Sequence, residues 1–311
     1  MSGAPSGGLA GGTRVLCVGR LYCDLIFTDV PRLPSLGTET FAGGLGLHAG
    51  GGAVITAAWL ASEGVAAGLA AMLPRAPFRE VVLPEIAAAG VDTALCGTLA
   101  TEADPQVTVA IAGRGDRAFL TRRSGPAAPA LTADDLRRAG VAHLHVGELA
   151  TLVERPELIA VAREAGATVS LDCGWDDALV TARVAPMLAR IDVFLPNADE
   201  MRALTACGLP ERPCPLTVIK RGAEGAVARS PEGSVSAPAA PARAVDTTGA
   251  GDAFNAGFLA AWLSGAPLAA CLAAGNRLGA RAIARPGGFH ADACPEGMPE
   301  AGRLTGSGVA G

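Results

Sequence analysis

The sequence predicts an α/β protein of three layers, in which a central, mostly parallel sheet lies between helices. From residue 143 onward, short apolar segments alternate with helical segments, which is typical of βαβ units. The first apolar run, 15–19, ends in glycine, as is common for a buried parallel strand. Two early segments, near 27–48 and 94–124, are rich in strand and turn signals. We expect them to form a small lid of strands outside the main sheet.

The elements are expected in the following order. The first half predicts a strand at 15–19, helices at 53–62 and 78–89, and a hairpin with strands at 106–112 and 118–121. The second half predicts a helix start near 131–135, strands at 143–146, 168–171, 193–195 and 216–219, helices at 155–165, 176–189 and 198–206, a proline-rich connector at 230–242 and a helix pair from 252 to about 283.

Composition narrows the function classes. Half of the 311 residues are apolar and 18% are charged, which excludes a disordered protein. The formal net charge of −5 argues against nucleic acid or an anionic membrane as partner, so we expect small-molecule partners. Two apolar stretches, 50–73 and 253–274, are each interrupted by polar or turn residues. This interruption favours buried helices over membrane spans.

The ends of the chain and the cysteines predict domain organisation and location. The first 13 residues lack the basic and apolar regions of a signal peptide, and we expect a disordered leader there. One domain is expected over 14–298, followed by a flexible tail over 299–311. The eight cysteines are scattered without a C-x-x-C pair, which indicates reduced thiols and predicts a cytoplasmic location.

A glycine-rich turn before a predicted helix carries the strongest chemical signal. Backbone N–H groups of Gly249, Ala250 and Gly251 at a helix start would form an anion hole. Asp252 follows in the first helical turn, where a carboxylate suits a general base. The single lysine, Lys220, lies outside any Gly-Lys-Ser/Thr loop, and we interpret it as a plain strand-end charge without a catalytic role. An anion hole beside a carboxylate predicts phosphoryl transfer to an alcohol.

The segment 246–252, Asp-Thr-Thr-Gly-Ala-Gly-Asp, resembles the C-terminal signature of the ribokinase or PfkB family of sugar kinases. The resemblance extends over most of the chain through 19–24, 196–200, 218–226 and 274–288. It implies a ribokinase-like fold with a β-strand lid, ATP as phosphoryl donor, Mg²⁺ and, in some members, K⁺. It also implies a homodimer formed through the lid strands.

The resemblance assigns roles by position. Asp252 would be the general base, and the amides at 249–251 would stabilise the phosphoryl group. Asp24, Gly50 and Gly51 would bind the acceptor. Nucleotide contacts are implied for Asn197, Gly222, Gly225, Thr247 and Asn276, water-mediated Mg²⁺ binding for Glu200, and a monovalent cation for Asp246.

Two departures from the family pattern lie on the acceptor side. Ile55 stands where the family has an asparagine that reads sugar hydroxyls, and Pro74-Arg75 stands where a Gly-Asp run is usual. Arginines at 75, 79, 114 and 123 suit an acidic or phosphorylated acceptor, although solvated surface charge explains them too. The acceptor therefore stays open among a small sugar with a primary hydroxyl, a nucleoside and a sugar acid.

Two other function classes compete with a kinase. The sequence Gly44-Leu-Gly-Leu-His-Ala49 matches a dinucleotide-binding fingerprint, but it lies about 25 residues after the first strand instead of at its end, which argues against an oxidoreductase. A catalytically inactive, sugar-sensing protein would explain the altered acceptor signature. The retained Asp252 and the intact anion turn favour an enzyme.

Overall fold

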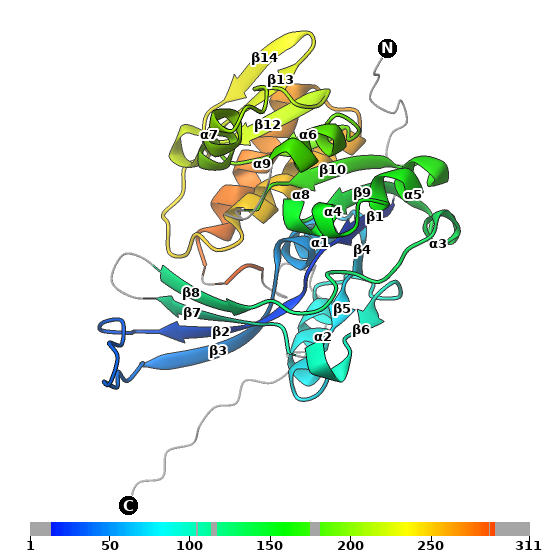
Figure 1. Ribbon diagram of the computed structural model, residues 1–311. Coiled ribbons are helices and arrows are strands. Elements are labelled where there is room, and N and C mark those ends of the chain that lie inside the picture. Colours follow the sequence, from blue (N-terminus) through cyan, green and yellow to red (C-terminus); the bar gives the residue numbers. More distant parts are fainter. Residues whose placement is uncertain (1–13, 104, 113–116, 175–180, 286, 290–311) are drawn as a thin grey trace, which may run out of the picture.

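The main sheet has eight strands in the order β14-β13-β12-β11-β10-β9-β1-β4 (Figure 1). The computed structural model describes residues 14–103, 105–112, 117–174, 181–285 and 287–289. The strands from β12 to β4 pair in parallel, and β13 and β14 add an antiparallel edge. The sheet comprises β1 (Arg14–Val18), β4 (Ala66–Ala70), β9 (Val141–Val146), β10 (Thr168–Asp172), β11 (Val193–Leu195), β12 (Leu216–Lys220), β13 (Ala226–Ser230) and β14 (Gly233–Ala237).

Helices cover both faces of this sheet, which confirms the predicted three layers. Val15 and Cys17 of β1 point into one apolar core, whereas Leu16 and Val18 point into the other. The first core is closed by α1 (Gly52–Ser62), α2 (Phe78–Ala88), α8 (Ala250–Leu263) and α9 (Leu268–Ala282). The second is closed by α3 (Ala133–Arg138), α4 (Leu149–Glu154), α5 (Leu158–Ala165), α6 (Thr181–Leu188) and α7 (Ala198–Ala206).

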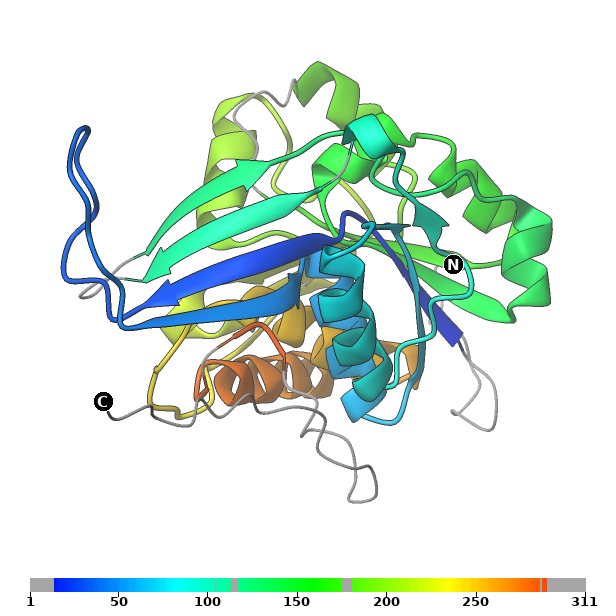
Figure 2. The same ribbon diagram turned by 90° about the horizontal axis from the view of Figure 1, so that it is seen from below.

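A separate four-stranded sheet projects from the body and forms the expected lid (Figure 2). Its order is β3-β2-β7-β8, with β2 (Tyr22–Thr28), β3 (Gly44–Gly50), β7 (Val107–Ala112) and β8 (Arg117–Arg122). The first lid strand begins before the predicted insertion at 27–48. Asp24 therefore lies within the lid, where it pairs with His48 and Thr108, and not in a loop after β1.

Arg20 joins the lid to the body. Its guanidinium, 7% exposed, donates to Gln106 Oε1 at 2.7 Å and to the carbonyl of Gly125 at 2.9 Å, and it pairs with Glu154 at 2.5 Å. Gln106 immediately precedes β7, and Gly125 closely follows β8. Arg20 itself lies between β1 and β2, so one side chain connects the roots of the lid strands.

Three sequence predictions about elements were wrong. The expected connector at 230–242 contains β14, which pairs with β13 through a short turn. β4 was not predicted because its Ala-Ala-Gly-Leu-Ala sequence has weak strand propensity, and burial between β1 and α1 decides its conformation. The helix expected at 155–165 begins three residues later, as α5, and α4, which ends just before Arg155, was not predicted; Pro156 disfavours a helical conformation at Arg155 and separates the two. The structure also has an unpredicted pair, β5 (Met72–Leu73) and β6 (Gly97–Thr98).

Other sequence predictions concern the chain ends, the thiols and the membrane. The predicted leader at 1–13 and tail at 299–311 lie outside the described residues. The seven cysteines within the described part of the chain are free thiols. Across the described ranges, no helix combines the length and apolarity needed to span a bilayer.

Candidate active site

The anion turn at 249–251 lies at the start of α8. Gly249 is the N-cap residue and has φ +70°, a conformation that glycine adopts without strain. A Cβ on Gly249 would lie 2.8 Å from the Gly288 carbonyl oxygen, so the position has no room for a side chain. The N–H groups of the first helical turn have no carbonyl partner four residues earlier, and the helix dipole adds positive potential. The turn is therefore suited to bind an anion.

Asp252, in the first turn of α8, lies between the starts of two helices. A Cβ on Gly52, the first residue of α1, would lie 2.9 Å from Asp252 Oδ1. Burial and the neighbouring Asp172 together raise the pKa of Asp252 to about 7, although Lys220 acts in the opposite direction. A buried carboxyl that titrates near neutral pH is suited to accept a proton from a hydroxyl.

A buried ion pair lies under the turn. Lys220 Nζ, at the end of β12, is 2.8 Å from Asp172 Oδ1 at the end of β10 and 3.2 Å from Asn255 Oδ1 on α8. Asn255 Nδ2 donates to Asp172 Oδ2 at 2.6 Å. The Lys220 side chain is only 11% exposed. The interpretation of Lys220 as a plain strand-end charge was therefore wrong.

Asn197 and Glu200 form a capping box at the start of α7. Asn197 Oδ1 accepts from the Glu200 N–H at 2.9 Å, and Glu200 Oε2 accepts from the Asn197 N–H at 2.7 Å. Burial and Asp172 raise the pKa of Glu200. Three carboxylates, from Asp172, Glu200 and Asp252, thus surround one ammonium group. This excess of negative charge fits a bound cation.

The residues predicted to contact nucleotide gather in two groups. Gly225 and Asn276 meet at 237–239: a Cβ on Gly225 would lie 2.6 Å from the Ala239 nitrogen, and Asn276 Nδ2 donates to the Pro238 carbonyl at 2.8 Å. Gly222, with φ +56°, begins the short turn that ends at Gly225. Thr247 is exposed next to Asp246, beside the anion turn. These positions border the carboxyl end of β12 and the start of α8.

Asp246 ties two loops together. Its Oδ1 accepts from the Thr248 N–H at 2.6 Å, and its Oδ2 accepts from the Gly287 N–H at 2.9 Å. Both carboxylate oxygens thus accept backbone hydrogen bonds, and these bonds fix the carboxylate between the two loops.

On the acceptor side, the structure brings Asp24 onto Gly50. The Asp24 carboxylate occupies the space that a Cβ of Gly50 would fill, and the missing Cβ of Gly51, with φ +111°, lets the Arg20 carbonyl approach. Burial raises the pKa of Asp24 to about 6, and His48 opposes this shift. His48 Nδ1 lies 3.0 Å from Glu85 Oε1 on α2.

Residues 13–292 match the sequence pattern of the pfkB family carbohydrate kinases. The chain belongs to this family. It is therefore an ATP-dependent phosphotransferase, and it is a sugar or nucleoside kinase by class.

Named relatives and solved structures agree with this membership. The chain is 31% identical over 295 residues to an ATP-dependent ribose-1-phosphate kinase from Halopiger xanaduensis, covering 88% of this chain and 93% of that protein. It is 27% identical to a fructokinase from Rhizobium leguminosarum, covering 79% and 78% of the two chains. The structure of Arabidopsis thaliana ribokinase complexed with ribose and ATP superposes with a TM-score of 0.74 at 20% identity, covering 92% and 96%. This last likeness shows that the fold is ribokinase-like.

Ile55 is a buried packing residue in this kinase. It is 5% exposed, and its Cδ1 lies 2.7 Å from where a Cβ on Gly288 would be. Its Cγ2 lies 3.0 Å from where a Cβ on Gly249 would be, and Trp59 Nε1 on the same helix donates to the Gly288 carbonyl at 2.9 Å. The hydrocarbon at position 55 therefore packs behind the anion turn.

Some site residues were missed by sequence reasoning. His48 and Glu85 were missed because they come from separate elements, although His48 is the register partner of Asp24 within the lid. Asp172 ends a buried strand, and that placement alone was a usable signal. Lys220 and Asn255 could not be paired with it before the sheet order and α8 were known.

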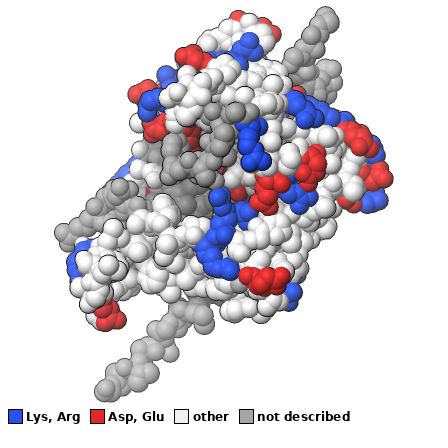
Figure 3. Space-filling model, in the orientation of Figure 1, with Lys and Arg blue, Asp and Glu red and all other residues white. Residues whose placement is uncertain are grey.

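Some of the arginines considered for an acidic or phosphorylated acceptor form hydrogen bonds within the protein. Arg75 Nε donates to the Leu99 carbonyl at 3.0 Å, and Arg79 Nη1 lies 3.4 Å from Thr98 Oγ1. Arg114 lies outside the described residues. On the face shown in Figure 3, basic side chains run down the middle of the molecule, between the lid and the body.

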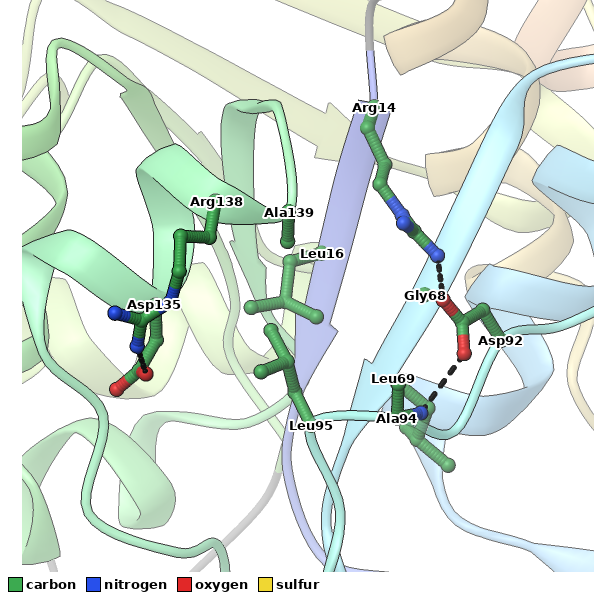
Figure 4. Close-up of a pocket in the computed structure, with 10 residues that line it drawn as sticks. All are labelled: Arg14, Leu16, Gly68, Leu69, Asp92, Ala94, Leu95, Asp135, Arg138 and Ala139. Carbon is green, nitrogen blue, oxygen red and sulfur yellow. Dashed lines mark hydrogen bonds and ion pairs between the residues drawn. The ribbon is translucent and has the colours of Figure 1, made fainter.

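A separate cavity of about 210 Å³ lies at the amino end of β1 (Figure 4). Two ion pairs line it, Arg14 with Asp92 and Arg138 with Asp135, together with apolar residues such as Leu16. Asp172 and Lys220 end their strands at the other edge of the sheet. Because ligands of open parallel sheets bind at the carboxyl ends of the strands, the kinase site is not this cavity.

Proposed function

We propose that this kinase transfers the γ-phosphoryl group of ATP to a primary hydroxyl of a small sugar or sugar-like acceptor, with Asp252 as general base. The acceptor oxygen forms a bond to the γ-phosphorus while its proton passes to Asp252. The bond from that phosphorus to the bridging oxygen breaks, and ADP leaves. The observation that carries the proposal is the buried Asp252 carboxylate at the anion turn, with a pKa of about 7.

The turn would stabilise the group in transfer. The amides at 249–251 would stabilise the oxygens of the phosphoryl group, where negative charge develops; of these three, the Ala250 N–H also donates to the Thr247 carbonyl at 3.3 Å. Gly249 permits the left-handed backbone that begins this arrangement. Because these donors are fixed before substrate binds, they need little reorganisation during the reaction.

A divalent cation fits the charge of the site. Asn197 and Glu200 would hold Mg²⁺ through water, since no group of three or more His, Cys, Asp or Glu side chains in the described residues is placed to ligate a metal directly. When bound, Mg²⁺ neutralises phosphate charge. Asp246, whose carboxylate is fixed between the segments at 248 and 287, would hold a monovalent cation such as K⁺.

The nucleotide would lie along the carboxyl edge between β12 and α9. Asn197, Gly222, Gly225, Thr247 and Asn276 border this edge. Gly222 has open space where a Cβ would be, which lets a ligand approach its backbone, whereas Gly225 lets the turn pack against 237–239. Asn276 holds the segment at 237–238 against α9 and so supports the wall of the same space.

Asp24, Gly50 and Gly51 would position the acceptor under the lid. The relative from Halopiger xanaduensis is named for a phosphorylated sugar, and basic side chains gather between the lid and the body (Figure 3). These two observations favour a sugar phosphate as the second candidate acceptor. Arginine forks bind phosphate well.

An acceptor screen coupled to ADP release tests this proposal. The panel contains ribose, fructose, ribose 1-phosphate, a sugar acid and a nucleoside, each with ATP and Mg²⁺. ADP formed with a neutral sugar supports the first candidate, and ADP formed only with the phosphorylated sugar supports the second. ATP binding without ADP release on any acceptor would support a sugar-sensing role and overturn the proposal.

We also propose a homodimer that forms through the lid. Leu45 and Leu120 are 54% and 74% exposed, and the strand register places both on the lid face opposite Asp24. Pairing of two lids would bury this apolar face. Light scattering should give twice the chain mass, and the double variant Leu45→Glu, Leu120→Glu should give a monomer. Leu36→Glu, in the exposed loop beyond β2, is the matched control. The predicted cytoplasmic location needs a separate test by cell fractionation.

A further inference from the structure

The buried lysine is held against one face of α8. Gly251 and Asn255 lie four residues apart on this helix and therefore share a face. Asn255 accepts a hydrogen bond from Lys220 Nζ, and a Cβ on Gly251 would lie 3.3 Å from the same nitrogen. Glycine at 251 thus serves two purposes, because it opens the anion turn above and leaves space for the ammonium group below.

The ammonium group of Lys220 has one N–H donor more than its two hydrogen bonds use. It donates to Asp172 at 2.8 Å and to Asn255 at 3.2 Å, and among the described residues no acceptor takes its third N–H. Asp172 is in turn fixed by the Asn255 amide. The position of Nζ is therefore set by two partners from different elements, β10 and α8.

The groups that face Asp252 come from several elements: Asp172 on β10, Glu200 on α7, Lys220 on β12 and Cys17 on β1. Burial raises the pKa of the Cys17 thiol, so it stays neutral. His145 on β9, beside Asp172 and Lys220, is also neutral because burial lowers its pKa to about 4. Within the described residues, Lys220 is thus the one positive charge of this cluster.

We propose that Lys220 is a positioning residue of the kinase, whose buried charge acts through Gly251 and Asp252 on the phosphoryl group in transfer. Asp172 and Asn255 hold this charge under the turn. In a phosphate-binding loop, a lysine contacts the phosphate itself. Lys220 instead lies against the first turn of α8, beside Gly251. The inference rests on the proposed function, because it takes Asp252 as the base.

Two single variants test it by opposite effects. In a plot of kcat against pH, the acid limb is the fall in kcat at low pH, where Asp252 becomes protonated. Lys220→Met removes the charge that favours ionised Asp252, so this limb should move to higher pH. Asp172→Asn removes a negative charge that disfavours ionised Asp252, so the limb should move to lower pH. In Lys220→Met, kcat at pH 8 should fall on the order of 10-fold to 100-fold, less than the 10²–10³ that loss of a donor touching the reacting oxygen costs. KM for the acceptor should stay within about threefold.

A double variant and a matched control keep the test decisive. Lys220→Met combined with Asp172→Asn removes both members of the ion pair together, so it should fold, retain a nearly wild-type limb and still lose kcat. Arg163→Met breaks an ion pair of similar length, 2.8 Å to Asp192, at the amino edge of the sheet and should change neither the limb nor kcat.

The outcomes separate this inference from the proposed function. Folded Lys220 variants with wild-type kcat, or limbs that move in the same direction in both single variants, would overturn the role of Lys220 while leaving Asp252 as base. An active Asp252→Asn enzyme would overturn the proposed function itself, and with it this inference.

Discussion

The catalytic centre and the lid are built in different ways. At the centre, short contacts among β10, β12 and α8 fix Lys220 and Asp172, and glycines at 52, 249 and 251 fit where a Cβ would collide or crowd. The lid contacts the body chiefly at its root, and Leu45, Phe119 and Leu120 near its far end are exposed. The comparison teaches that the proposed chemistry belongs to a tightly packed centre, whereas the proposed acceptor site lies against a sheet whose far end is exposed.

The largest expected effect tests the centre. Asp252→Asn should lower kcat by about 10³-fold to 10⁴-fold, because an amide cannot accept the hydroxyl proton, while ATP affinity stays nearly unchanged. Single-turnover ADP formation and calorimetric ATP binding measure the two quantities. If the variant kept wild-type turnover, Asp252 would not be the base. The centre could then not be contrasted with the lid as the site of the chemistry.

The stability of the same variant is the internal control. Folding raises the pKa of Asp252, so the stabilisation that its protonated form gives is present below the unfolded pKa and is lost as pH rises through about 7. Asp252→Asn should therefore melt at a higher temperature than wild type at pH 8, with a smaller difference at pH 5. A lower melting temperature at pH 8 would show that the rate loss reflects damage to the fold.

The pH dependence gives the next largest effect. Because burial raises the pKa of Asp252 to about 7, kcat/KM for the acceptor should fall roughly tenfold for each pH unit below that value. Initial rates from pH 5 to 9 at fixed MgATP check this expectation. A flat profile down to pH 5 would mean that the base is ionised throughout, contrary to its burial.

The lid is tested by Asp24→Asn. A hydrogen bond from an acceptor hydroxyl to a charged group is worth about 1.5–3 kcal/mol, so KM for the acceptor should rise on the order of 10-fold to 100-fold with a smaller change in kcat. Steady-state kinetics with the acceptor found in the screen measures both constants. A fall in kcat without a change in KM would mean that Asp24 takes part in the chemical step. The lid and the catalytic centre would then not have separate roles.

The smallest effect concerns the boundary between the two regions. Ile55→Val removes one methylene from behind the anion turn and should cost about 0.5–1.5 kcal/mol of unfolding free energy. The preference among acceptors should stay the same, since the side chain packs on Gly249 and Gly288. Urea unfolding and the acceptor panel provide the two readouts, and a changed preference would assign Ile55 to the acceptor pocket.

Local signals predicted much of the fold because they coincide with local physics. The helix over 198–206 was predicted at its observed bounds, since Asn197 and Glu200 form a capping box that can be read from four adjacent residues. β4 and β14 could not be predicted, because alanine-rich and serine-rich segments become strands only when neighbours cover or pair with them.

The candidate site likewise has one part that can be predicted from the sequence and one part that cannot. Asp252 and the glycines beside it form one continuous motif, so the turn and the base were predictable together. The Lys220–Asp172–Asn255 cluster joins residues that are 35 to 83 positions apart. Only the order of the strands and the placement of α8 bring these three side chains together, and no local pattern signals it.

The hydrogen bonds of Arg20 bear on how the lid of such enzymes can change in evolution. Since one buried guanidinium joins β1 to the start of β7 and the end of β8, the lid strands beyond it can change while their root stays in place. On the proposed role of the lid, a lineage could thus acquire a new acceptor by substitutions in the distal lid, without passing through an inactive centre. Exchange of lid segments between related kinases would succeed most readily where Arg20, Gln106 and Glu154 are exchanged or retained as a set.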